Sequence, residues 1–599
     1  MGTIKMQEIR GVKWKRDGLW IVGIIVMALV VLAPQINYHA MAIGDDWEFQ
    51  WNRFYEAAMQ IKNGHFNFFQ SIYAFRQSGR VVNAVYGSAF AYLNGFILIL
   101  VKTWFRAQII SSFLCLLTAG SGMYFLARYC RVKRQLAFGA AVLYMGTPLV
   151  MFYVTDTALR GWGAALLPFA TIPLIRMVRN HDRPINPVLF GLAAGSLLAV
   201  QNFTALLYVL SAVVFFIPGL YLARDRYRTL LAAGGAVAIA VGLNAATLAA
   251  LIDLHHESLV MPYRVKDLIG SASQLSLGNM TRLDFGLILS FVVVIQLVFA
   301  ALSWKNLALY EKIINVDGLL FLWLSSPLFP WNVIGKHFPV IQTIQFPQRF
   351  NAVALTMIIL GAVLSLQKLG RGNFMQLRLI AAAFISLAGL NLINGYTWVN
   401  EKASAWRGDQ LAVSADSTIK DQSKIRDLFN HAYDQSHVFS VITKNTPDYL
   451  PVTQTGNTLF AYDAYKSQIL NHPLKVVIGV NSDSQVVYKW KAKSRKSVLI
   501  PAIVYRHSTV MLNGTLLSRS EYHRSNIGAL IVTPRKGRFL KNQVNSLLKK
   551  QPAIRHVSRH QMSTFLINRN CRNPPITGNG QVIGTFCLIK RRQCQRCFC

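Results

Sequence analysis

Long apolar segments recur over the first two thirds of this 599-residue chain, and they constrain its fold more than any other feature. Each segment is long enough to cross about 30 Å of hydrocarbon as a helix. Only 15% of the residues are charged, whereas soluble proteins carry about 25%. We therefore expect a mainly α, polytopic transmembrane bundle. Its eleven predicted crossings lie near residues 19–38, 107–128, 136–153, 160–177, 187–203, 204–223, 229–252, 285–304, 315–333, 350–367 and 378–397.

Lysine and arginine collect in the short cytoplasmic loops of membrane proteins, and this rule orients the chain. The segment before the first crossing holds the bases Lys5, Arg10, Lys13, Lys15 and Arg16. We therefore expect a cytoplasmic N-terminus, a first external loop over residues 39–106, and an extracytoplasmic location for everything after Trp398. The same rule places five further basic loops inside, at residues 128–134, 176–183, 224–228, 305–312 and 368–378.

One apolar segment, residues 83–101, conflicts with this orientation if it crosses the bilayer. Every later basic loop would then lie outside, against the charge rule. We therefore expect this segment to lie along the outer leaflet or to dip into it as a re-entrant helix.

A cluster of three acids follows the first crossing, namely Asp45, Asp46 and Glu48 in the stretch Gly44–Gln50. The chain has only 25 acids against 62 bases, so acids gathered at a bilayer surface need an explanation. Asp46 is a candidate general base, with Asp45 as the near alternative, because an aspartate with an ordinary pKa near 3.9 is ionised at neutral pH. The alternative interpretation is that the two aspartates cap an interfacial helix.

Two other predicted outer loops carry candidate ligands. Arg349, preceded by Gln345, offers a guanidinium fork to phosphate where the loop re-enters the bilayer, and the alternative is an arginine that snorkels to the headgroups. Asp156 is a candidate ligand for an acceptor or a divalent cation. Arg160 follows four residues later, a spacing that also permits a plain helical Asp–Arg pair.

Weaker candidates complete the outer face. Arg264, Arg76 and Arg80 are candidate phosphate contacts, with headgroup anchoring as the commoner explanation. Tyr263 is a candidate for stacking on a sugar ring, and an interfacial aromatic belt is the alternative. Whether the chain needs a metal is unknown from the sequence.

The chain changes character after the last predicted crossing. Residues 399–568 alternate short apolar runs with turns, which predicts a mostly β, sandwich-like domain with some helix near 416–435. The tail, residues 569–599, is basic and rich in cysteine, with a lone Cys594-x-x-Cys597 that amounts to half of a zinc motif. We expect this tail to be disordered or frameshifted. The bases behind the net charge of +37 form no compact stripe with aromatic residues, which argues against nucleic-acid binding.

Three passages resemble a known family. They are Gly44-Asp45-Asp46 with Arg53 and Gly64-His65 downstream, Ile344-Gln345-Phe346-Pro347-Gln348-Arg349-Phe350, and Pro447-Asp448-Tyr449-Leu450-Pro451 with the apolar run at 500–505. Together they resemble bacterial membrane proteins labelled "6-pyruvoyl-tetrahydropterin-synthase-related", within the GT-C glycosyltransferase superfamily. The resemblance covers the chain to about residue 540. Asp45 stands where the family has histidine, and Gln348 where it has tryptophan.

This resemblance implies an inverting transfer of a sugar from a polyprenyl-phosphate donor to an acceptor of the cell envelope, such as a glycan or a teichoic-acid-like polymer. It also implies that Arg53 and His65 contact substrate. Two rival functions stay open: a flippase or transporter of lipid-linked sugars, and a non-enzymatic envelope protein that binds polymer. A transporter would be expected to show matched repeats and broken helices at the bilayer midplane, which the sequence does not display.

Overall fold

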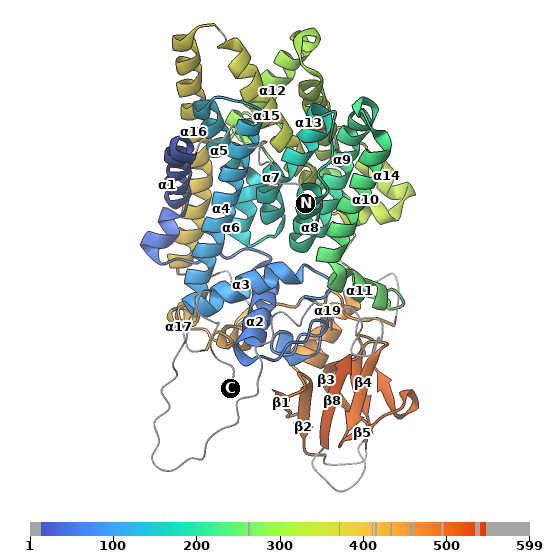
Figure 1. Cartoon of the computed structure of the whole chain (residues 1–599). Coiled ribbons are helices and arrows are strands. Elements are labelled where there is room, and N and C mark those ends of the chain that lie inside the picture. Colours follow the sequence, from blue (N-terminus) through green and yellow to red (C-terminus); the bar gives the residue numbers. More distant parts are fainter. Residues whose placement is uncertain are drawn as a thin grey trace, which may run out of the picture. The chain divides into compact units, whose positions relative to one another are not determined.

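The computed structural model describes residues 14–261, 264–370, 372–409, 411, 413, 416–431, 434–453, 459–492, 496–533 and 540–546. Helices dominate the chain up to residue 407, and short antiparallel strands follow from residue 477 (Figure 1). The predicted class, mainly α with a small distal β region, is thereby confirmed. The predicted cysteine-rich tail, residues 569–599, lies outside the described residues.

Within the described residues, six helices are long and apolar enough to cross a membrane: α1 (from Asp17), α4, α7, α9, α15 (with the preceding turn from Pro347) and α16. Two bent pairs raise this number to eight if each pair counts as one span: α5 with α6, bent by 49°, and α10 with α11, bent by 72°. The bounds are α1 Trp14–Tyr38, α4 Trp104–Tyr129, α5 Arg134–Met145, α6 Pro148–Asp156, α7 Arg160–Arg179, α9 Asn202–Leu222, α10 Arg226–Leu243, α11 Ala245–Asp253, α15 Asn351–Leu369 and α16 Phe374–Arg407.

The other predicted crossings also coincide with helices, but with shorter ones. They are α8 Pro187–Val200, α12 Gly286–Leu302 and α13 Leu309–Ser325, followed by the short α14 Trp331–His337. Helices α8 and α12 are apolar but have 14 and 17 residues, which is short for a full span of about 20 residues. Each of the eleven predicted segments is therefore helical, while the exact number of crossings stays a prediction.

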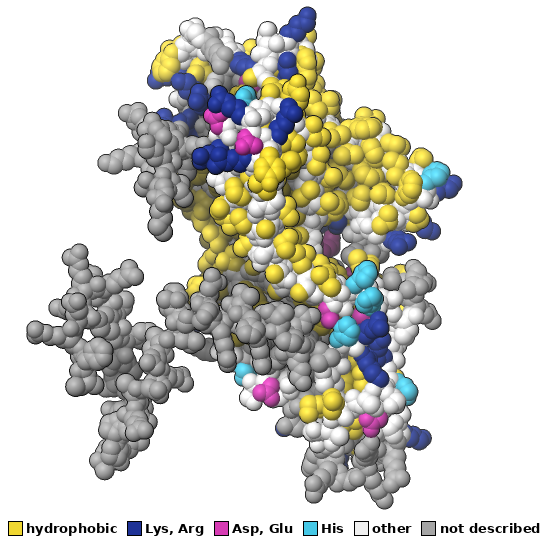
Figure 2. All heavy atoms as spheres, turned by 45° about the vertical axis from the view of Figure 1, so that its right-hand side comes forward, with side chains coloured by type: hydrophobic (Ala, Val, Ile, Leu, Met, Phe, Trp, Pro, Cys, Tyr) yellow, Lys and Arg dark blue, Asp and Glu magenta, His cyan; other side chains and the backbone are white. Residues whose placement is uncertain are grey.

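The basic loops meet at one end of the bundle. Buried Asp17, at the start of α1, accepts a hydrogen bond of 2.7 Å from Arg134 in the second of these loops. Lys368, at the end of α15, pairs with Glu311 at the start of α13. Arg179, at the end of α7, donates to the carbonyl of Tyr129. Figure 2 shows lysine and arginine gathered at this end, above a wide apolar surface.

The first predicted external loop forms helices at the other end of the bundle. Helix α2 spans Trp47–Asn63 and α3 spans Ser88–Val101, and Figure 1 shows both between the long helices and the strands. Helix α3 begins beside Arg53 of α2, which binds the carbonyl of Gly87 at 3.0 Å. It ends at Lys102, whose carbonyl accepts from distal Gln435. Since both ends lie on one side of the bundle, this arrangement agrees with an interfacial segment.

A strained turn follows α2. Phe75, Arg76 and Gln77 have φ values of 51°, 58° and 53°, a left-handed conformation that costs roughly 1–2 kcal/mol for each residue with a side chain. The buried Glu56 carboxylate holds the chain before the turn, because it accepts three backbone N–H bonds of 2.7–2.8 Å from residues 72–74. Asn52 accepts the next one, from Phe75.

The distal strands form two antiparallel sheets. One has the order β1-β2-β8-β4-β5 and the other the order β3-β7-β6. Apolar side chains of β2, β3, β4, β6 and β7 form one core together with Ile72 of the first external loop. The strand bounds are β1 Val477–Val480, β2 Val486–Trp490, β3 Val498–Ile503, β4 Ser508–Leu512, β5 Thr515–Leu516, β6 Tyr522–Arg524, β7 Ala529–Val532 and β8 Leu540–Ser546.

Short distal helices join the strands to the bundle. They are α17 Gln422–Leu428, α18 His437–Val441 and α19 Leu459–Tyr465. Trp51 of α2 stacks on Trp104 at 4.6 Å and meets Phe429, just after α17, edge-on. The predicted domain boundary at residue 399 falls inside α16, which continues to Arg407. The domain limits 1–398 and 399–568 stay a prediction.

We expect Glu56→Gln to destabilise the protein by about 3 kcal/mol, because the amide replaces one acceptor oxygen and leaves buried N–H groups without a partner. Thermal unfolding of the full chain in detergent, followed by tryptophan fluorescence, measures this change. Lys62→Gln, at an exposed position of the same helix, is the control and should stay within about 0.5 kcal/mol of the parent. Equal midpoints for Glu56→Gln and the parent would refute the assigned role.

Candidate active site

The acidic loop lies directly against the end of α6. Gly44 packs so closely on Asp156 that a Cβ at position 44 would lie 2.1 Å from the Asp156 Oδ1 atom. Ala42 is fixed from below by Gln108 of α4, which accepts from its N–H at 3.0 Å and donates to its carbonyl at 2.7 Å. Only glycine permits this approach, so Gly44 brings two aspartates of distant sequence together.

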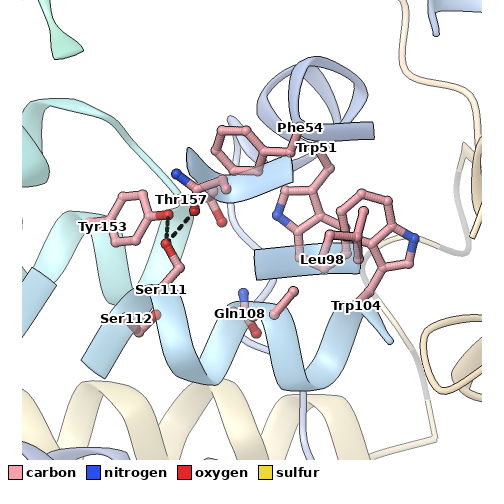
Figure 3. A pocket seen from close by; sticks show the side chains of 11 residues that line it. Trp51, Phe54, Leu98, Trp104, Gln108, Ser111, Ser112, Tyr153 and Thr157 are labelled. Carbon is pink, nitrogen blue, oxygen red and sulfur yellow. Dashed lines mark hydrogen bonds between the residues drawn. The ribbon is translucent and has the colours of Figure 1, made fainter. Parts of the chain in front are cut away.

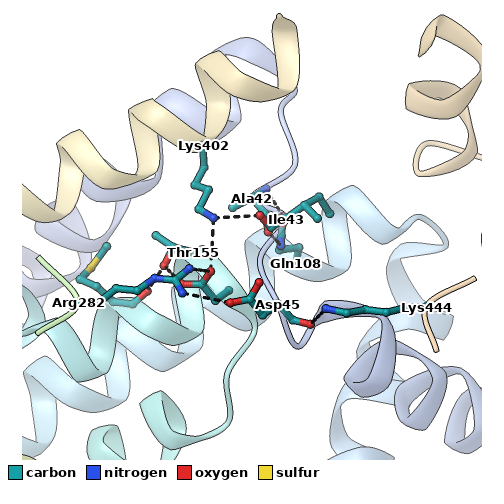
Figure 4. Close-up of polar contacts among 10 residues, drawn as sticks. Ala42, Ile43, Asp45, Gln108, Thr155, Arg282, Lys402 and Lys444 are labelled. Carbon is teal, nitrogen blue, oxygen red and sulfur yellow. Dashed lines mark hydrogen bonds and ion pairs between the residues drawn. The ribbon is translucent and has the colours of Figure 1, made fainter. Parts of the chain in front are cut away.

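Three cations from distant segments brace this loop (Figure 4). The Arg282 guanidinium lies between two carboxylates, 3.1 Å from Asp45 Oδ2 and 2.7 Å from Asp156 Oδ1. Lys402, near the end of α16, donates to the Ile43 carbonyl at 3.1 Å and lies 3.4 Å from Asp156 Oδ1. Lys444 donates to the carbonyl of Asp45 at 2.5 Å. The position of the loop therefore depends on ion pairs as well as on packing.

Asp46 stands at the N-cap position of α2, but its side chain makes no capping hydrogen bond. Asp46 thus occupies the predicted capping position, but its side chain does not cap the helix. No cation of the described residues lies within ion-pair distance of the Asp46 carboxylate, which solvent reaches. Surrounding protein nevertheless removes part of its hydration, and this burial raises its pKa above the ordinary value, although the charges of Arg160 and Lys444 act the other way.

The two aspartates therefore differ. Burial also acts to raise the pKa of Asp45, but the hydrogen bond and charge of Arg282, with Lys444 and Lys402, outweigh it and hold that pKa below its ordinary value. Asp45 is committed to a salt bridge. Asp46 is the carboxylate with the greater proton affinity, and a separation of this kind distinguishes a base from a structural acid.

Two arginines lie around Phe346 within electrostatic range of Asp46. The Arg160 guanidinium lies 4.0 Å from the ring centre of Phe152 and 5.6 Å from that of Phe346. The Arg349 guanidinium lies 5.1 Å from the ring centre of Phe346 and donates to Gln345 Oε1 at 3.1 Å. Asp46, Arg160 and Arg349 therefore lie close enough for their charges to interact.

Backbone strain accompanies this arrangement. Gln345 has a φ of 62° and Thr157, the residue after Asp156, has a φ of 58°. Non-glycine residues seldom adopt such values, and they cluster at functional sites. Pro347, two residues after Gln345, begins the short helical turn Pro347–Phe350 that carries Arg349.

Lys444 also lies near a second group of polar side chains, which surrounds Glu48. Its charge acts on both Asp46 and Glu48. Glu48 is 8% exposed and accepts a hydrogen bond of 2.6 Å from Asn52. Burial raises the pKa of Glu48 to about 7, against the charges of Arg80 and Lys444. Sequence reasoning counted Glu48 in the acidic cluster but gave it no role.

A small hollow adjoins the loop, between α2, α3, α4 and α6 (Figure 3). Trp51 and Trp104 form one side, and Ser111, Tyr153 and Thr157 form the other. The Ser111 hydroxyl lies 2.6 Å from the Tyr153 hydroxyl and donates to Asn94. Thr157, the residue after Asp156, lines this hollow.

Other predicted site residues lie elsewhere. Arg53 is fully buried and donates to Asn83, Gln50 and the carbonyls of Tyr86 and Gly87, so it holds the start of α3. His65 lies past the far end of α2, roughly 25 Å from Asp46 by helix rise, and contacts the Tyr73 hydroxyl at 3.0 Å.

Arg264 is exposed, and Tyr263 lies outside the described residues.

The alternative of a helical Asp156–Arg160 pair is wrong. Asp156 ends α6 and Arg160 begins α7, so the two are not one helical turn apart. Asp156 pairs with Arg282 and Lys402 instead.

Sequence reasoning did not identify Arg282, Lys402 or Lys444. A signal existed for the first two, because both are bases at the predicted outer ends of crossings, where the charge rule disfavours them.

The described residues contain no group of three or more His, Cys, Asp or Glu side chains that could hold a metal. The Asp156 carboxylate does not fit the predicted alternative of a divalent-cation ligand as it stands. Its Oδ1 faces Arg282 and Lys402, and its Oδ2 accepts from Thr155 at 2.8 Å. Two cations already neutralise this carboxylate.

No protein-family model matches this chain, and no curated protein sequence matches it. Among solved structures it is similar to "Single-Particle Cryo-EM Structure of Arabinofuranosyltransferase AftD from Mycobacteria", with 15% sequence identity and a TM-score of 0.43. The similarity covers 65% of this chain and 27% of that one, so this chain matches about a quarter of the length of that protein. At such values the likeness assigns no activity.

We expect Glu48→Gln to flatten the pH dependence of stability. Since the folded-state pKa of Glu48, about 7, lies above its ordinary value of 4.5, its contribution is fully present below pH 4.5 and is lost as the pH rises through 7. The neutral variant should be more stable than the parent at pH 8 by about 3 kcal/mol. Thermal unfolding from pH 4.5 to 8 measures this, and parallel profiles would contradict it.

Proposed function

We propose that the protein is an integral membrane glycosyltransferase that moves a sugar from a polyprenyl-phosphate donor to an acceptor of the cell envelope. The observation that carries the proposal is the grouping of Asp46, a carboxylate without an ion-pair partner among the described residues, with Arg160 and Arg349 at one end of an apolar bundle. A base and two guanidiniums at membrane level match what a lipid-borne phosphate donor requires.

The arginines hold the leaving group. A guanidinium presents parallel N–H donors that fit phosphate oxygens, and Arg349 lies close enough to Arg160 for its positive charge to act on that residue. Such a pair of like charges is stabilised by an anion between them. Both lie at ends of apolar helices, where a phosphate attached to a membrane lipid arrives without leaving the bilayer.

Asp46 acts as the general base. As the acceptor hydroxyl oxygen forms a bond to the anomeric carbon, its proton passes to the Asp46 carboxylate. The bond between that carbon and the phosphate oxygen breaks, and the electron pair leaves with the lipid phosphate, whose new charge Arg160 and Arg349 stabilise. Attack opposite the leaving group inverts the anomeric carbon.

We also propose that the site faces the outside of the cell. The basic loops gather at the opposite end of the bundle, where Asp17 binds Arg134 and Lys368 binds Glu311. The charge rule assigns that end to the cytoplasm. The N-terminus would then be cytoplasmic, and the distal β region extracytoplasmic.

Asp46→Asn should lower transfer by about 10²–10⁴-fold, the usual contribution of a general base. The assay supplies membranes with labelled polyprenyl-phosphate sugars and measures label in envelope polymer. Asp45→Asn is the matched control: it removes one exposed salt bridge, worth about 1 kcal/mol or less, so the loss should stay below about tenfold. Undiminished transfer by Asp46→Asn, with protein levels equal, would exclude Asp46 as the base.

Arg349→Gln should weaken binding of decaprenyl monophosphate by roughly tenfold to a hundredfold, since a hydrogen bond to a charged group contributes about 1.5–3 kcal/mol. Native mass spectrometry of the detergent-solubilised chain measures the occupancy. Arg378→Gln, an exposed arginine of α16 next to the basic loops, is the control. Equal binding by both variants would remove Arg349 from the donor site.

A further inference from the structure

A second group of charged side chains lies beside Asp46 and is not used by the proposed reaction. Arg80, Lys444 and Arg76 are the cations that act most strongly on Glu48. Of these, only Lys444 is also among the strongest charges on Asp46. The group therefore borders the candidate active site and is distinct from the Arg160–Arg349 pair.

The strained turn presents Arg76 to this group. Arg76 is the middle residue of the three with left-handed φ values, and its charge acts on Glu48 and on Tyr465. Evolution keeps such strain where the surrounding structure determines it and where it serves a site. Glu56 and Asn52 determine it here through four backbone hydrogen bonds.

The N–H donors of the Arg76 guanidinium make few hydrogen bonds to the described residues. Arg76 donates from Nη2 to the Ser440 carbonyl over a long distance of 3.5 Å, and its buried Nε has no hydrogen-bond partner among the described residues. The side chain is half-buried, so one part of it reaches solvent. A guanidinium in this state has donors to spare for a ligand.

Arg80 and Glu48 are the buried members of this charged group. Arg80 is fully buried, and its guanidinium lies between the rings of Phe75 and Tyr465, at 4.7 Å and 5.0 Å from their centres. It donates to the Tyr465 hydroxyl and to the Asp448 carbonyl, while its Nε has no partner. The buried Glu48 Oε2 atom also has none. Buried polar atoms without partners are uncommon in native proteins, and a ligand in this group would supply partners to both.

We propose that Arg76 and Lys444, backed by Glu48 and Arg80, form a second binding site that takes an anionic group of the acceptor, either a phosphate or a sugar carboxylate.

The charge of the group favours an anion over a cation. Burial raises the pKa of both carboxyls here, Glu48 and Asp448, against the charge of Arg80. With a pKa of about 7, Glu48 is partly protonated at neutral pH, and three basic side chains, Arg80, Lys444 and Arg76, act on it.

The location assigns the site to the acceptor, and this step rests on the proposed function. The donor reaches Arg160 and Arg349 from the bilayer, and Asp46 must contact the acceptor hydroxyl. Lys444 donates to the Asp45 carbonyl, and its charge acts on both Asp46 and Glu48. It lies on the side where α2 meets the distal helices. An acceptor with its anionic group at Arg76 thus reaches the base without displacing the donor.

The test measures binding of three soluble probes to the full chain in phosphatidylcholine nanodiscs by saturation-transfer NMR. Glucuronic acid and glucose 6-phosphate carry the two anionic groups, and glucose is the neutral reference. At least one anionic probe should bind about tenfold more tightly than glucose, and Arg76→Gln should abolish this difference. Arg76→Lys should retain part of it, and Lys62→Gln, which removes an exposed charge from α2, should retain all of it.

Three results would overturn the proposal: anionic probes that bind no better than glucose, unchanged binding by Arg76→Gln that unfolds at the parental temperature, or loss of binding in nanodiscs of phosphatidylglycerol, which would assign Arg76 to headgroups. Arg349→Gln separates this proposal from the proposed function. It should retain probe binding, whereas failure of the transferase assignment would appear as undiminished transfer by Asp46→Asn.

Discussion

The guanidinium of Arg282 between Asp45 and Asp156 is the interaction on which the candidate site depends. It joins the first external loop, the break between α6 and α7, and the long loop before α12. Gly44 makes the joint possible because no larger residue fits against Asp156. Exposed ion pairs contribute little singly, but Arg282, Lys402 and Lys444 act on one short loop, and together with the Gln108 clamp they define its position.

This bracing separates the functions of neighbouring acids. Asp45 is neutralised by Arg282, whereas Asp46 receives only more distant charges and keeps a raised pKa. Glu48, two residues further along and buried, has a pKa raised to about 7. Three acids within four positions thus have three environments. Asp45 and Asp46 precede α2 at the surface, whereas Glu48 in the first turn of α2 is buried. We propose that one sequence motif thereby supplies a general base, a structural salt bridge and a residue of a second binding site.

The sequence predicted the helical bundle well, since apolar length alone determines which segments are helices in a membrane. The structure places α3, Ser88–Val101, against α2, while its predicted position along the outer leaflet stays a prediction. Arg53 belongs to the motif of the resemblance, and the structure shows it donating to the carbonyl of Gly87 at the start of α3. Its contact with substrate stays a prediction. Arg282, Lys402 and Lys444 were missed because they come from segments distant in sequence, and only folding brings them to Gly44. The left-handed turn at Phe75–Gln77 could not be predicted, because it contains no glycine, the residue that usually indicates such a conformation.

The central claim is that Asp46, Arg160 and Arg349 form one site for a lipid-borne phosphate. Cryo-electron microscopy of the full chain in nanodiscs with decaprenyl monophosphate tests it most directly. The account predicts phosphate density within hydrogen-bond distance, about 3 Å, of both guanidiniums, with the Asp46 carboxylate facing it. Phosphate bound at the opposite end of the bundle, or an Asp46 carboxylate turned away from the arginines, would contradict the account.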